Sequence, residues 1–483
     1  MAKKHHPTQM DATRRQLLAG IAGGSVIALT GCGSGDEAAQ AAARALPDPQ
    51  DSGIDHIVVV MMENRSFDHF LGWVAGADGR QAGLSYPDRD GHRIATFHLA
   101  SDPGYGYQGC GKEDPSHSYA GGRSHYNHGA MNGFLQTVET PGDHFPVGYY
   151  LADDLPFYKG VAEHFTLCDR YFCGILASTF PNRVYMHAGQ TDRLDNAFPI
   201  VQQAPSNLPT IWDLMAAKGL RARYYFHDLP FTGLWGAKHL AISRPYAQFL
   251  LEANAGTLPA LSYVDPYFAV AVGEEPGASR DDHPHADIRD GQAFLNQVYN
   301  TLRASPNWER TLLIINYDEW GGFYDHVAPP LAPISAAEAA LGNDGRLGFR
   351  VPCAIIGPRA RRGHVSHFQF DPSSILNLIR WRFGLGNLCA RDDSAANLAL
   401  ALDFDNPPNP DAPAFDVPTS TLGFGRECTT GLPLGLPLTE LLNLPLGELR
   451  NLPAALRAYV EHNAELRSLL DLATASGFAG SGP

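Results

Sequence analysis

Residues 311–326 read TLLIINYDEWGGFYDH. The first part is a short apolar and β-branched run, which predicts a strand buried on both faces, as in a parallel sheet covered by helices. Asp318 and Glu319 then emerge at the carboxyl end of this strand, where open α/β sheets bind ligands. Two adjacent acids at a dry strand end repel each other unless a cation lies between them. The alternative is a solvated turn, because Gly321 and Gly322 follow at once.

A second stretch repeats the pattern. Residues 57–62 (IVVVMM) predict another buried strand, and this one leads into Glu63 and Asn64. Two strand ends that each deliver a pair of oxygen donors predict a site for a hard or borderline divalent ion. Calcium, magnesium and manganese suit such a set, and zinc stays open because carboxylates also bind it well.

The segment 178–183 (STFPNR) predicts the start of a helix. Pro181 favours a first helical turn, and either Ser178 or Thr179 is a suitable N-cap. A functional interpretation of Thr179 is also open, because a hydroxyl at a helix N-terminus lies beside free N–H groups that favour a phosphate. A metal would lower the pKa of that hydroxyl and make Thr179 a nucleophile. Arg183, one turn later, would neutralise a phosphoryl oxygen.

Four motifs together resemble the bacterial phosphoesterase family of phospholipases C and acid phosphatases. They occur in the family's order within residues 54–385. The resemblance implies an alkaline-phosphatase-like α/β fold with a doubly wound, mostly parallel sheet. The motifs are residues 63–68 (ENRSFD), 179–183 (TFPNR), 282–284 (DHP) and 318–326 (DEWGGFYDH).

The resemblance implies a metal site that also activates the nucleophile. Glu63, Asn64, Asp318 and Glu319 match the family's metal ligands. Thr179 matches the nucleophile, which is Thr in the phospholipase-like branch and Ser in the acid-phosphatase branch, and it also contacts the metal. The implied cofactor is therefore a divalent metal ion.

Further polar residues match positions around the phosphoryl group and the leaving oxygen. These are His117 and His283, and one of the two protonates the departing alkoxide and later activates water, with Asp282 fixing its tautomer. His326 closes the last motif and belongs to the same shell. Trp320 departs from the family, in which many relatives have His after the Asp-Glu pair, and Trp here could line an apolar substrate entrance.

The implied reaction is hydrolysis of a phosphodiester through a phosphothreonine intermediate. A phospholipid such as phosphatidylcholine is the favoured substrate class. Phosphomonoester hydrolysis by the same residues, in the manner of an acid phosphatase, is the first alternative. An alternative of another class is a non-catalytic surface lipoprotein that keeps the fold for binding, although the intact set of motif residues counts against it.

The N-terminus carries the features of an export signal. Basic residues precede the apolar stretch 17–30, which is too short to span a bilayer comfortably. Residues 13–18 (TRRQLL) resemble the twin-arginine consensus. Residues 29–32 (LTGC) resemble a lipobox, which would place a lipid anchor on Cys32, whereas ordinary cleavage would discard Cys32. We expect a periplasmic or cell-envelope lipoprotein at a membrane surface.

Composition divides the 483 residues into four segments. Alternating strands and helices in the third predict the doubly wound sheet, with helices at 157–169, 211–218, 291–303 and 373–383 and strands at 223–226, 261–264 and 349–357. A Leu-rich helical stretch at 439–473 predicts a C-terminal extension packed on the core. The segments are the export signal (1–31), a flexible tether (32–50), the catalytic domain (51–392) and a Pro-rich segment with the helical extension (393–483).

Charge and cysteine content restrict the partners and the compartment. The formal net charge of −15 argues against nucleic acid as a partner. The six cysteines after Cys32 permit disulfides in an exported protein, and Cys168 and Cys173 are the most natural pair because they are near neighbours. The other pairings stay open.

Overall fold

The computed structural model describes residues 46–196, 205–270, 278–425, 428, 452 and 454–478. These residues belong to one compact unit that covers 44–483. The predicted export signal, Cys32 and most of the predicted tether lie outside the described residues. Among the helices described, none is both long enough and apolar enough to cross a membrane.

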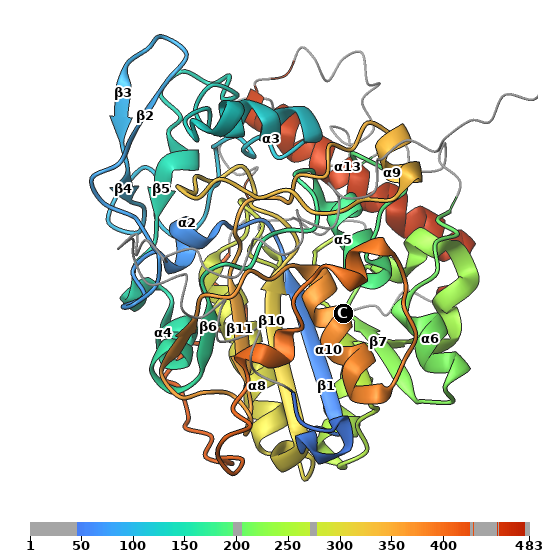
Figure 1. Cartoon of the computed structure of the whole chain (residues 1–483). Helices are drawn as coiled ribbons and strands as arrows, with labels where there is room; N and C mark the ends of the chain where they lie inside the picture. Colours follow the sequence, from blue (N-terminus) through green and yellow to red (C-terminus); the bar gives the residue numbers. More distant parts are fainter. Residues whose placement is uncertain are drawn as a thin grey trace, which may run out of the picture. The chain divides into compact units, whose positions relative to one another are not determined.

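An eight-stranded sheet with the order β12-β6-β11-β10-β1-β9-β7-β8 forms the centre of this unit (Figure 1). Strand β11 is antiparallel to both of its neighbours, and all the other neighbouring pairs are parallel. The strands are β1 (His56–Met62), β6 (Thr166–Cys168), β7 (Ala222–Phe226), β8 (Ser243–Pro245), β9 (Leu261–Val264), β10 (Thr311–Tyr317), β11 (Cys353–Ile356) and β12 (His364–Ser366).

Helices cover both faces of the sheet. Helix α8 packs on α4 and α7, whereas α5 packs on α6 and α10 on the other face (Figure 1). The longer helices are α4 (Pro156–His164), α5 (Thr179–Ala188), α6 (Ile211–Ala217), α7 (Tyr246–Asn254), α8 (Ile288–Arg303), α10 (Pro372–Phe383) and α13 (Ala454–Ala475). The predicted fold class, a doubly wound and mostly parallel α/β sheet with a helical C-terminal extension, is confirmed.

Shorter elements complete the described chain. The short helices are α2 (Phe67–Leu71), α3 (Tyr119–Tyr126) and α9 (Ala336–Ala340), and two small sheets pair β2 (Ser85–Pro87) with β3 (Arg93–Ala95) and β4 (Phe97–His98) with β5 (Gly148–Tyr149). Turns of 3₁₀ helix are η1 (Pro49–Ser52), η2 (Asn127–Gly129), η3 (Phe145–Val147), η4 (Ala152–Asp154), η6 (Phe231–Ile242), η8 (Trp308–Arg310), η9 (Ala390–Asp393) and η10 (Leu398–Ala401).

The two central strands are the ones that the sequence predicts most clearly. All of β10 and all but the first residue of β1 are buried, which explains their continuous apolar runs. They pair in parallel, with Met62 opposite Tyr317. The N–H of Asp318 donates to the carbonyl of Met62 (3.0 Å). The residues that follow both strands therefore leave the sheet at the same edge.

Two predicted segments differ from the structure. The predicted helix 157–169 ends at His164, because residues 166–168 form the short strand β6 beside β11 and β12. The predicted C-terminal helix is described from Ala454, and residues 439–451 lie outside the described part. Helix α13 packs against η6, where Leu469 and Ala473 are buried.

The described disulfide joins Cys110 to Cys428. The expected pairing of Cys168 with Cys173 is wrong. Cys168 ends β6, and the Sγ–H of Cys173 donates to the carbonyl of Phe349 (3.0 Å). Backbone bridges hold the intervening chain to Phe370 and Arg350, so nearness in the sequence does not bring the two sulfurs together.

Candidate active site

Four of the predicted ligands meet Thr179 at the carboxyl edge of the two central strands. Glu63 and Asn64 follow β1, Asp318 and Glu319 follow β10, and all four are at most 1% exposed. The N–H of Asn64 donates to Oδ1 of Asp318 (3.2 Å), and the hydroxyl of Thr179 donates to Oε2 of Glu63 (3.3 Å). The structure therefore brings together residues that lie up to 256 positions apart in the sequence.

Thr179 is the first residue of α5, and Ser178 is its N-cap. The Ser178 hydroxyl does not cap the helix, because its Oγ accepts a hydrogen bond from the N–H of Asn196 (3.1 Å). The Thr179 side chain, in turn, faces Glu63. Thr179 is therefore not the N-cap of α5, and its interpretation as a nucleophile stays a prediction.

Two glycines permit the close approach of the β10 end to its neighbours. Gly321 and Gly322 have φ of 61° and 73°, a region that favours glycine. A Cβ on Gly321 would lie 2.1 Å from the carbonyl oxygen of Asn64, and one on Gly322 would lie 2.5 Å from Cβ of Pro115. The Gly-Gly pair is thus part of the site's construction rather than a solvated turn.

Replacing Gly321 with alanine is expected to lower the free energy of unfolding by about 3 kcal/mol, from the left-handed backbone and the overlap with Asn64 together. Gly76 is a matched control, because its φ is also positive (82°) but nothing lies within 4 Å of its would-be Cβ. There the same substitution should cost only about 1 kcal/mol. Urea unfolding of both variants measures the difference, and equal losses would contradict the close approach.

The site holds more negative than positive charge. The only described cation in direct contact with it is Arg183, whose NH2 lies 2.6 Å from Oε1 of Glu63 and whose NH1 lies 3.0 Å from Oδ1 of Asp265. Burial raises the pKa of Glu63 and of Glu319 well above the usual range, and the Asp318 carboxylate raises both further. Burial also raises the pKa of Asp318, against the opposing effect of Arg183. The described residues therefore do not supply enough positive charge to neutralise these carboxylates.

Several ligand atoms in this set also lack hydrogen-bond partners. Oδ1 of Asn64, Oδ2 of Asp318 and Oε1 of Glu319 are buried and accept no hydrogen bond. Buried acceptors are normally satisfied, so such a group points to a bound ion or water. A divalent cation fits the oxygen donors and the excess negative charge. We name this group of Glu63, Asn64, Thr179, Asp318 and Glu319 the carboxylate site.

Arg183 contacts the ligands themselves. Besides Glu63 and Asp265, its NH2 donates to the carbonyl of Met61 (3.3 Å), and its Nε lies 3.8 Å from Oδ2 of Asp318. Its guanidinium is 2% exposed. The prediction that Arg183 neutralises a phosphoryl oxygen stays a prediction, and in the structure its guanidinium contacts Glu63 and Asp265.

The two predicted histidines lie in different surroundings. His117 is the more accessible, and its Nδ1 lies 2.9 Å from the carbonyl oxygen of Pro115 and 3.9 Å from Oε1 of Glu319. His283 is 2% exposed in its side chain, and Nε2 lies 3.3 Å from Oδ2 of Asp114 without the alignment of a hydrogen bond. Burial lowers the pKa of His283 to about 4. Of the two, His117 is therefore the one that borders the carboxylate site and is partly open to solvent.

Asp282 does not contact the His283 ring as expected. Its Oδ2 accepts a hydrogen bond from the Tyr317 hydroxyl (2.5 Å), and its φ of 72° turns the carboxylate toward Gly291. Burial raises its pKa to about 7. The carboxylate beside His283 is that of Asp114, a residue of the same loop as His117.

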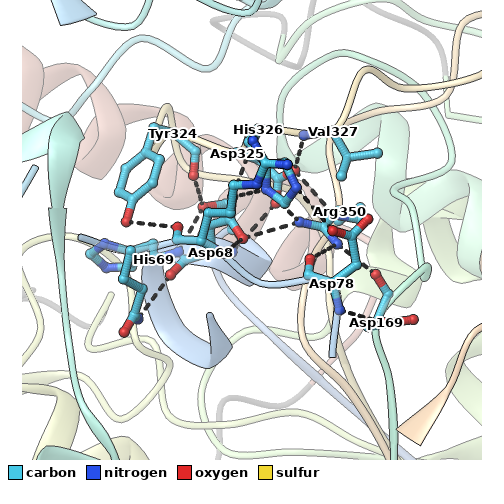
Figure 2. Close-up of polar contacts among 12 residues, drawn as sticks. Asp68, His69, Asp78, Asp169, Tyr324, Asp325, His326, Val327 and Arg350 are labelled. Carbon is cyan, nitrogen blue, oxygen red and sulfur yellow. Dashed lines mark hydrogen bonds and ion pairs between the residues drawn. The ribbon is translucent and has the colours of Figure 1, made fainter. Parts of the chain in front are cut away.

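His326 lies in a separate cluster with Asp68, Asp325 and Arg350 (Figure 2). Its Nδ1 is 2.6 Å from Oδ2 of Asp68, and its Nε2 is 3.1 Å from Oδ1 of Asp78. The prediction placed His326 among the polar residues around the phosphoryl group, whereas in the structure its two ring nitrogens face Asp68 and Asp78. The turn at Gly321 and Gly322 separates the end of the last motif from its beginning.

The same cluster joins two of the motifs. Arg350 donates through NH2 to Oδ1 of Asp68 (3.1 Å) and through Nε to Oδ1 of Asp325 (3.0 Å), as Figure 2 shows. All three side chains are fully buried. Because Asp68 ends the first motif and Asp325 lies near the end of the last, this ion-pair network fixes the two strand ends against each other.

Trp320 does not line a substrate entrance. It is fully buried and packs with Leu176 and Phe349, and its indole N–H donates to Nδ1 of His125 (3.2 Å). An indole only donates, so the proton of His125 resides on Nε2, which lies 2.9 Å from the hydroxyl of Thr137. Trp320 thereby ties the Asp-Glu turn to α3.

His125 predicts a pH dependence of stability. Burial, together with a smaller contribution from His117, lowers its pKa in the fold to about 3. Below about pH 6.5, His125 therefore becomes protonated in the unfolded chain but stays neutral in the folded protein. This difference should lower the free energy of unfolding by about 2 kcal/mol at pH 5 relative to pH 8. In His125→Asn, whose amide oxygen still accepts from Trp320, that loss should be absent. Urea unfolding at both pH values tests this. The prediction is contradicted if the free energy of unfolding changes between pH 8 and pH 5 by the same amount in the wild type and the variant.

Other described groups have ligand atoms close enough for a metal ion. Asp114, His283 and His462 bring theirs within 4.8 Å of one another, as do Asp68, Asp325 and His326. His462 is in α13 and stacks on His283 at 3.6 Å between ring centroids. His462 was not predicted as a site residue, because no motif surrounds it in the sequence. Asp114 could have been found, since it precedes His117 by three residues.

Comparisons with known proteins point to one family. A family model described as the phosphoesterase family matches residues 54–386. Non-specific phospholipase C1 of Arabidopsis thaliana is 34% identical over 400 residues, which cover 74% of this chain and 73% of the relative. Phospholipase C A of Mycobacterium tuberculosis is 31% identical over 427 residues, which cover 76% and 80%.

A similar solved structure is a phosphonate monoester hydrolase of Agrobacterium radiobacter, with a TM-score of 0.34 and 11% identity. The match covers 72% of this chain and 77% of that one. A similarity of this size carries no weight for the chemistry.

Proposed function

The chain belongs to the phosphoesterase family and is a hydrolase of phosphoric ester bonds, and from this premise we propose a metal-dependent, phospholipase C-like phosphodiesterase with Thr179 as the nucleophile. One observation carries the proposal. The Thr179 hydroxyl lies against a buried set of oxygen donors, three of which lack a hydrogen-bond partner. A hydroxyl is rarely buried among uncompensated carboxylates unless a cation joins them.

Each residue of the site has a separate role in the proposed reaction. A divalent ion, when bound by Glu63, Asn64, Asp318 and Glu319, supplies positive charge that favours the alkoxide of Thr179 and offsets charge on the phosphoryl group. Thr179 attacks phosphorus, the bond to the leaving oxygen breaks, and the resulting phosphothreonine is then hydrolysed by water. The N-terminus of α5, where Thr179 lies, favours the negative phosphoryl group.

His117 is the proton carrier in this proposal. Its Nδ1 faces the Pro115 carbonyl at 2.9 Å, which fixes the ring, and lies 3.7 Å from Oδ1 of Asp114 and 3.9 Å from Oε1 of Glu319. The ring then protonates the departing alkoxide and later takes the proton of the attacking water. Arg183 orients Glu63, and Asp282 and His326 stabilise the surrounding fold.

The relatives support a lipid diester as the substrate, because those named above are called phospholipases C. Hydrolysis of phosphomonoesters by the same residues remains the alternative activity, and a non-catalytic binding protein is the alternative of another class. Export by the twin-arginine route to the periplasm or cell envelope, with a lipid on Cys32, is also part of the proposal. The Cys110–Cys428 disulfide supports an oxidising compartment.

Side-by-side assays separate these functions. The purified chain, treated with chelator and then supplied with Mn²⁺, Ca²⁺, Mg²⁺ or Zn²⁺, is given a short-chain phosphatidylcholine and p-nitrophenyl phosphate. We expect hydrolysis of the diester that the chelator abolishes and one of the ions restores. Faster hydrolysis of the monoester would favour the acid-phosphatase activity. Failure on both substrates with every ion would contradict an enzyme of this kind.

A further inference from the structure

A cavity of about 290 Å³ lies beside His117 and Ser178, next to the nucleophile. Helix α13 contributes Glu461, His462 and Glu465 to its wall, and the loop of His117 forms another side. The C-terminal extension therefore helps to form a space that adjoins His117 and Ser178, the neighbours of Glu319 and Thr179. We name this space the α13 cavity.

The α13 cavity is acidic. Asp114, Asp195, Glu461 and Glu465 line it, and the described lining residues include neither Lys nor Arg. Two described arginines outside the lining act on these acids, Arg123 on Asp195 and Arg457 on Glu461, but each forms its ion pair elsewhere, with Asp344 (2.8 Å) and with Glu139. The cavity is thus negatively charged, although the phosphate of the proposed substrate is negatively charged as well.

These acids have few hydrogen-bond donors. Glu465 accepts from the amide of Asn196 (2.8 Å), and burial raises its pKa to about 8. Asp195 accepts from the N–H of Tyr119 (2.8 Å), and burial raises its pKa too. Oδ1 of Asp114, whose side chain is 6% exposed, accepts no hydrogen bond, and the ring nitrogen of His117 lies 3.7 Å away from it. A buried carboxylate oxygen that accepts no hydrogen bond at the wall of an acidic cavity points to a cationic occupant.

Short hydrogen bonds connect the cavity to the nucleophile. The Asn196 side chain, which donates to Glu465, also accepts from the N–H of Phe180 (2.7 Å), the residue after Thr179. The N–H of Asn196 donates to Ser178 (3.1 Å). A substituent on a phosphorus atom held at Thr179 therefore has the α13 cavity as its neighbouring space.

The composition of the wall discriminates between kinds of ammonium. A primary ammonium has three N–H donors for carboxylates, whereas a quaternary ammonium has none and is recognised by the faces of aromatic rings. None of the described residues that line the cavity is Phe, Tyr or Trp. Carboxylates without an aromatic cage favour the primary ammonium.

We propose that the α13 cavity binds the primary ammonium of an aminoethyl-type head group, so that the enzyme prefers ethanolamine phosphodiesters to choline phosphodiesters. This inference rests on the proposed function and specifies its substrate. Glu465 and Glu461 are specificity-determining residues in this arrangement, and neither takes part in the phosphoryl transfer itself.

The test compares the dihexanoyl forms of phosphatidylethanolamine, phosphatidylcholine and phosphatidylglycerol. Because these short-chain lipids are soluble, differences between lipid surfaces do not affect the rates. For the metal-loaded full chain we expect kcat/KM for the ethanolamine diester to exceed that for the choline diester at least tenfold. Glu465→Gln keeps the size of the side chain and an acceptor for Asn196, and it should reduce this ratio at least fivefold. Glu461→Gln should reduce it less, because Glu461 is more exposed. Glu163→Gln, an exposed acid of α4, is the matched control and should leave the ratio unchanged.

The outcomes are distinguishable. Equal rates on the ethanolamine and choline diesters, a preference for choline, or an unchanged ratio in Glu465→Gln would overturn the inference while leaving the phosphodiesterase intact. Hydrolysis of none of the three diesters would overturn the proposed function and the inference with it.

Discussion

Replacing Thr179 with valine is expected to lower kcat for phosphodiester hydrolysis about a thousandfold or more, because loss of a nucleophile removes the covalent route. Valine keeps the β-branched shape of threonine, and position 179 is only 1% exposed, so packing should be preserved. The hydroxyl that faces Glu63 at 3.3 Å is the only polar group removed. Steady-state assays on the metal-loaded protein measure the effect.

Serine at the same position is the matched control. It keeps the hydroxyl and loses a methyl group, so activity should stay within about tenfold of the wild type. A valine variant that retained activity within tenfold would show that another group attacks phosphorus. A serine variant as inactive as valine would show that the methyl group, and not the hydroxyl, matters.

Asp318→Asn should abolish activity and yet stabilise the metal-free fold. The substitution removes one of three buried carboxylates whose mutual repulsion Arg183 offsets only in part, and we expect a gain of about 1–2 kcal/mol in unfolding free energy under chelator. With a charged ligand missing, affinity for the divalent ion should fall about a hundredfold and kcat about a thousandfold. Urea unfolding with and without metal and titration calorimetry measure both effects.

Asp325→Asn is the contrasting control. Asp325 is as buried as Asp318, but Arg350 donates to its Oδ1 at 3.0 Å. Removing its charge leaves a buried guanidinium underpaired and should destabilise the fold by about 3 kcal/mol without changing metal affinity. If both substitutions destabilised the metal-free protein alike, the carboxylate site would be an ordinary ion-pair network.

The sequence predicts the part of the site that depends on strands. The apolar runs before Glu63 and Asp318 identify β1 and β10, and parallel neighbours necessarily deliver their next residues to one edge. Motif spacing adds Thr179, because a helix that begins at Pro181 or just before it places this hydroxyl at an N-terminus. These inferences need only local pattern and the rules of α/β sheets.

The remainder depends on tertiary packing that local pattern does not contain. His326 is close to Asp318 in the sequence, but two glycines with positive φ turn the chain so that it pairs with Asp68 instead. His462 reaches His283 from a helix far along the chain. Arg183 matches a motif, yet its contacts with Glu63 and Asp265 appear only in the fold.

The acidic residues of the α13 cavity also could not be assigned to a site from local sequence pattern. Glu461 and Glu465 are one turn apart on a helix, which by itself predicts a solvated face. Only the packing of α13 beside His117 and Ser178 turns these residues into part of a substrate site. The C-terminal extension therefore has a role in specificity that its sequence does not reveal.

The central claim is that a divalent ion at the ends of β1 and β10 lies beside Thr179. Diffraction from crystals grown with Mn²⁺, collected above the manganese absorption edge, tests it most directly. The account predicts the strongest anomalous peak within coordination distance of Glu63, Asn64, Asp318 and Glu319, next to the Thr179 hydroxyl. A strongest peak at Asp68, Asp325 and His326 instead, or no peak at the carboxylate site, would contradict it.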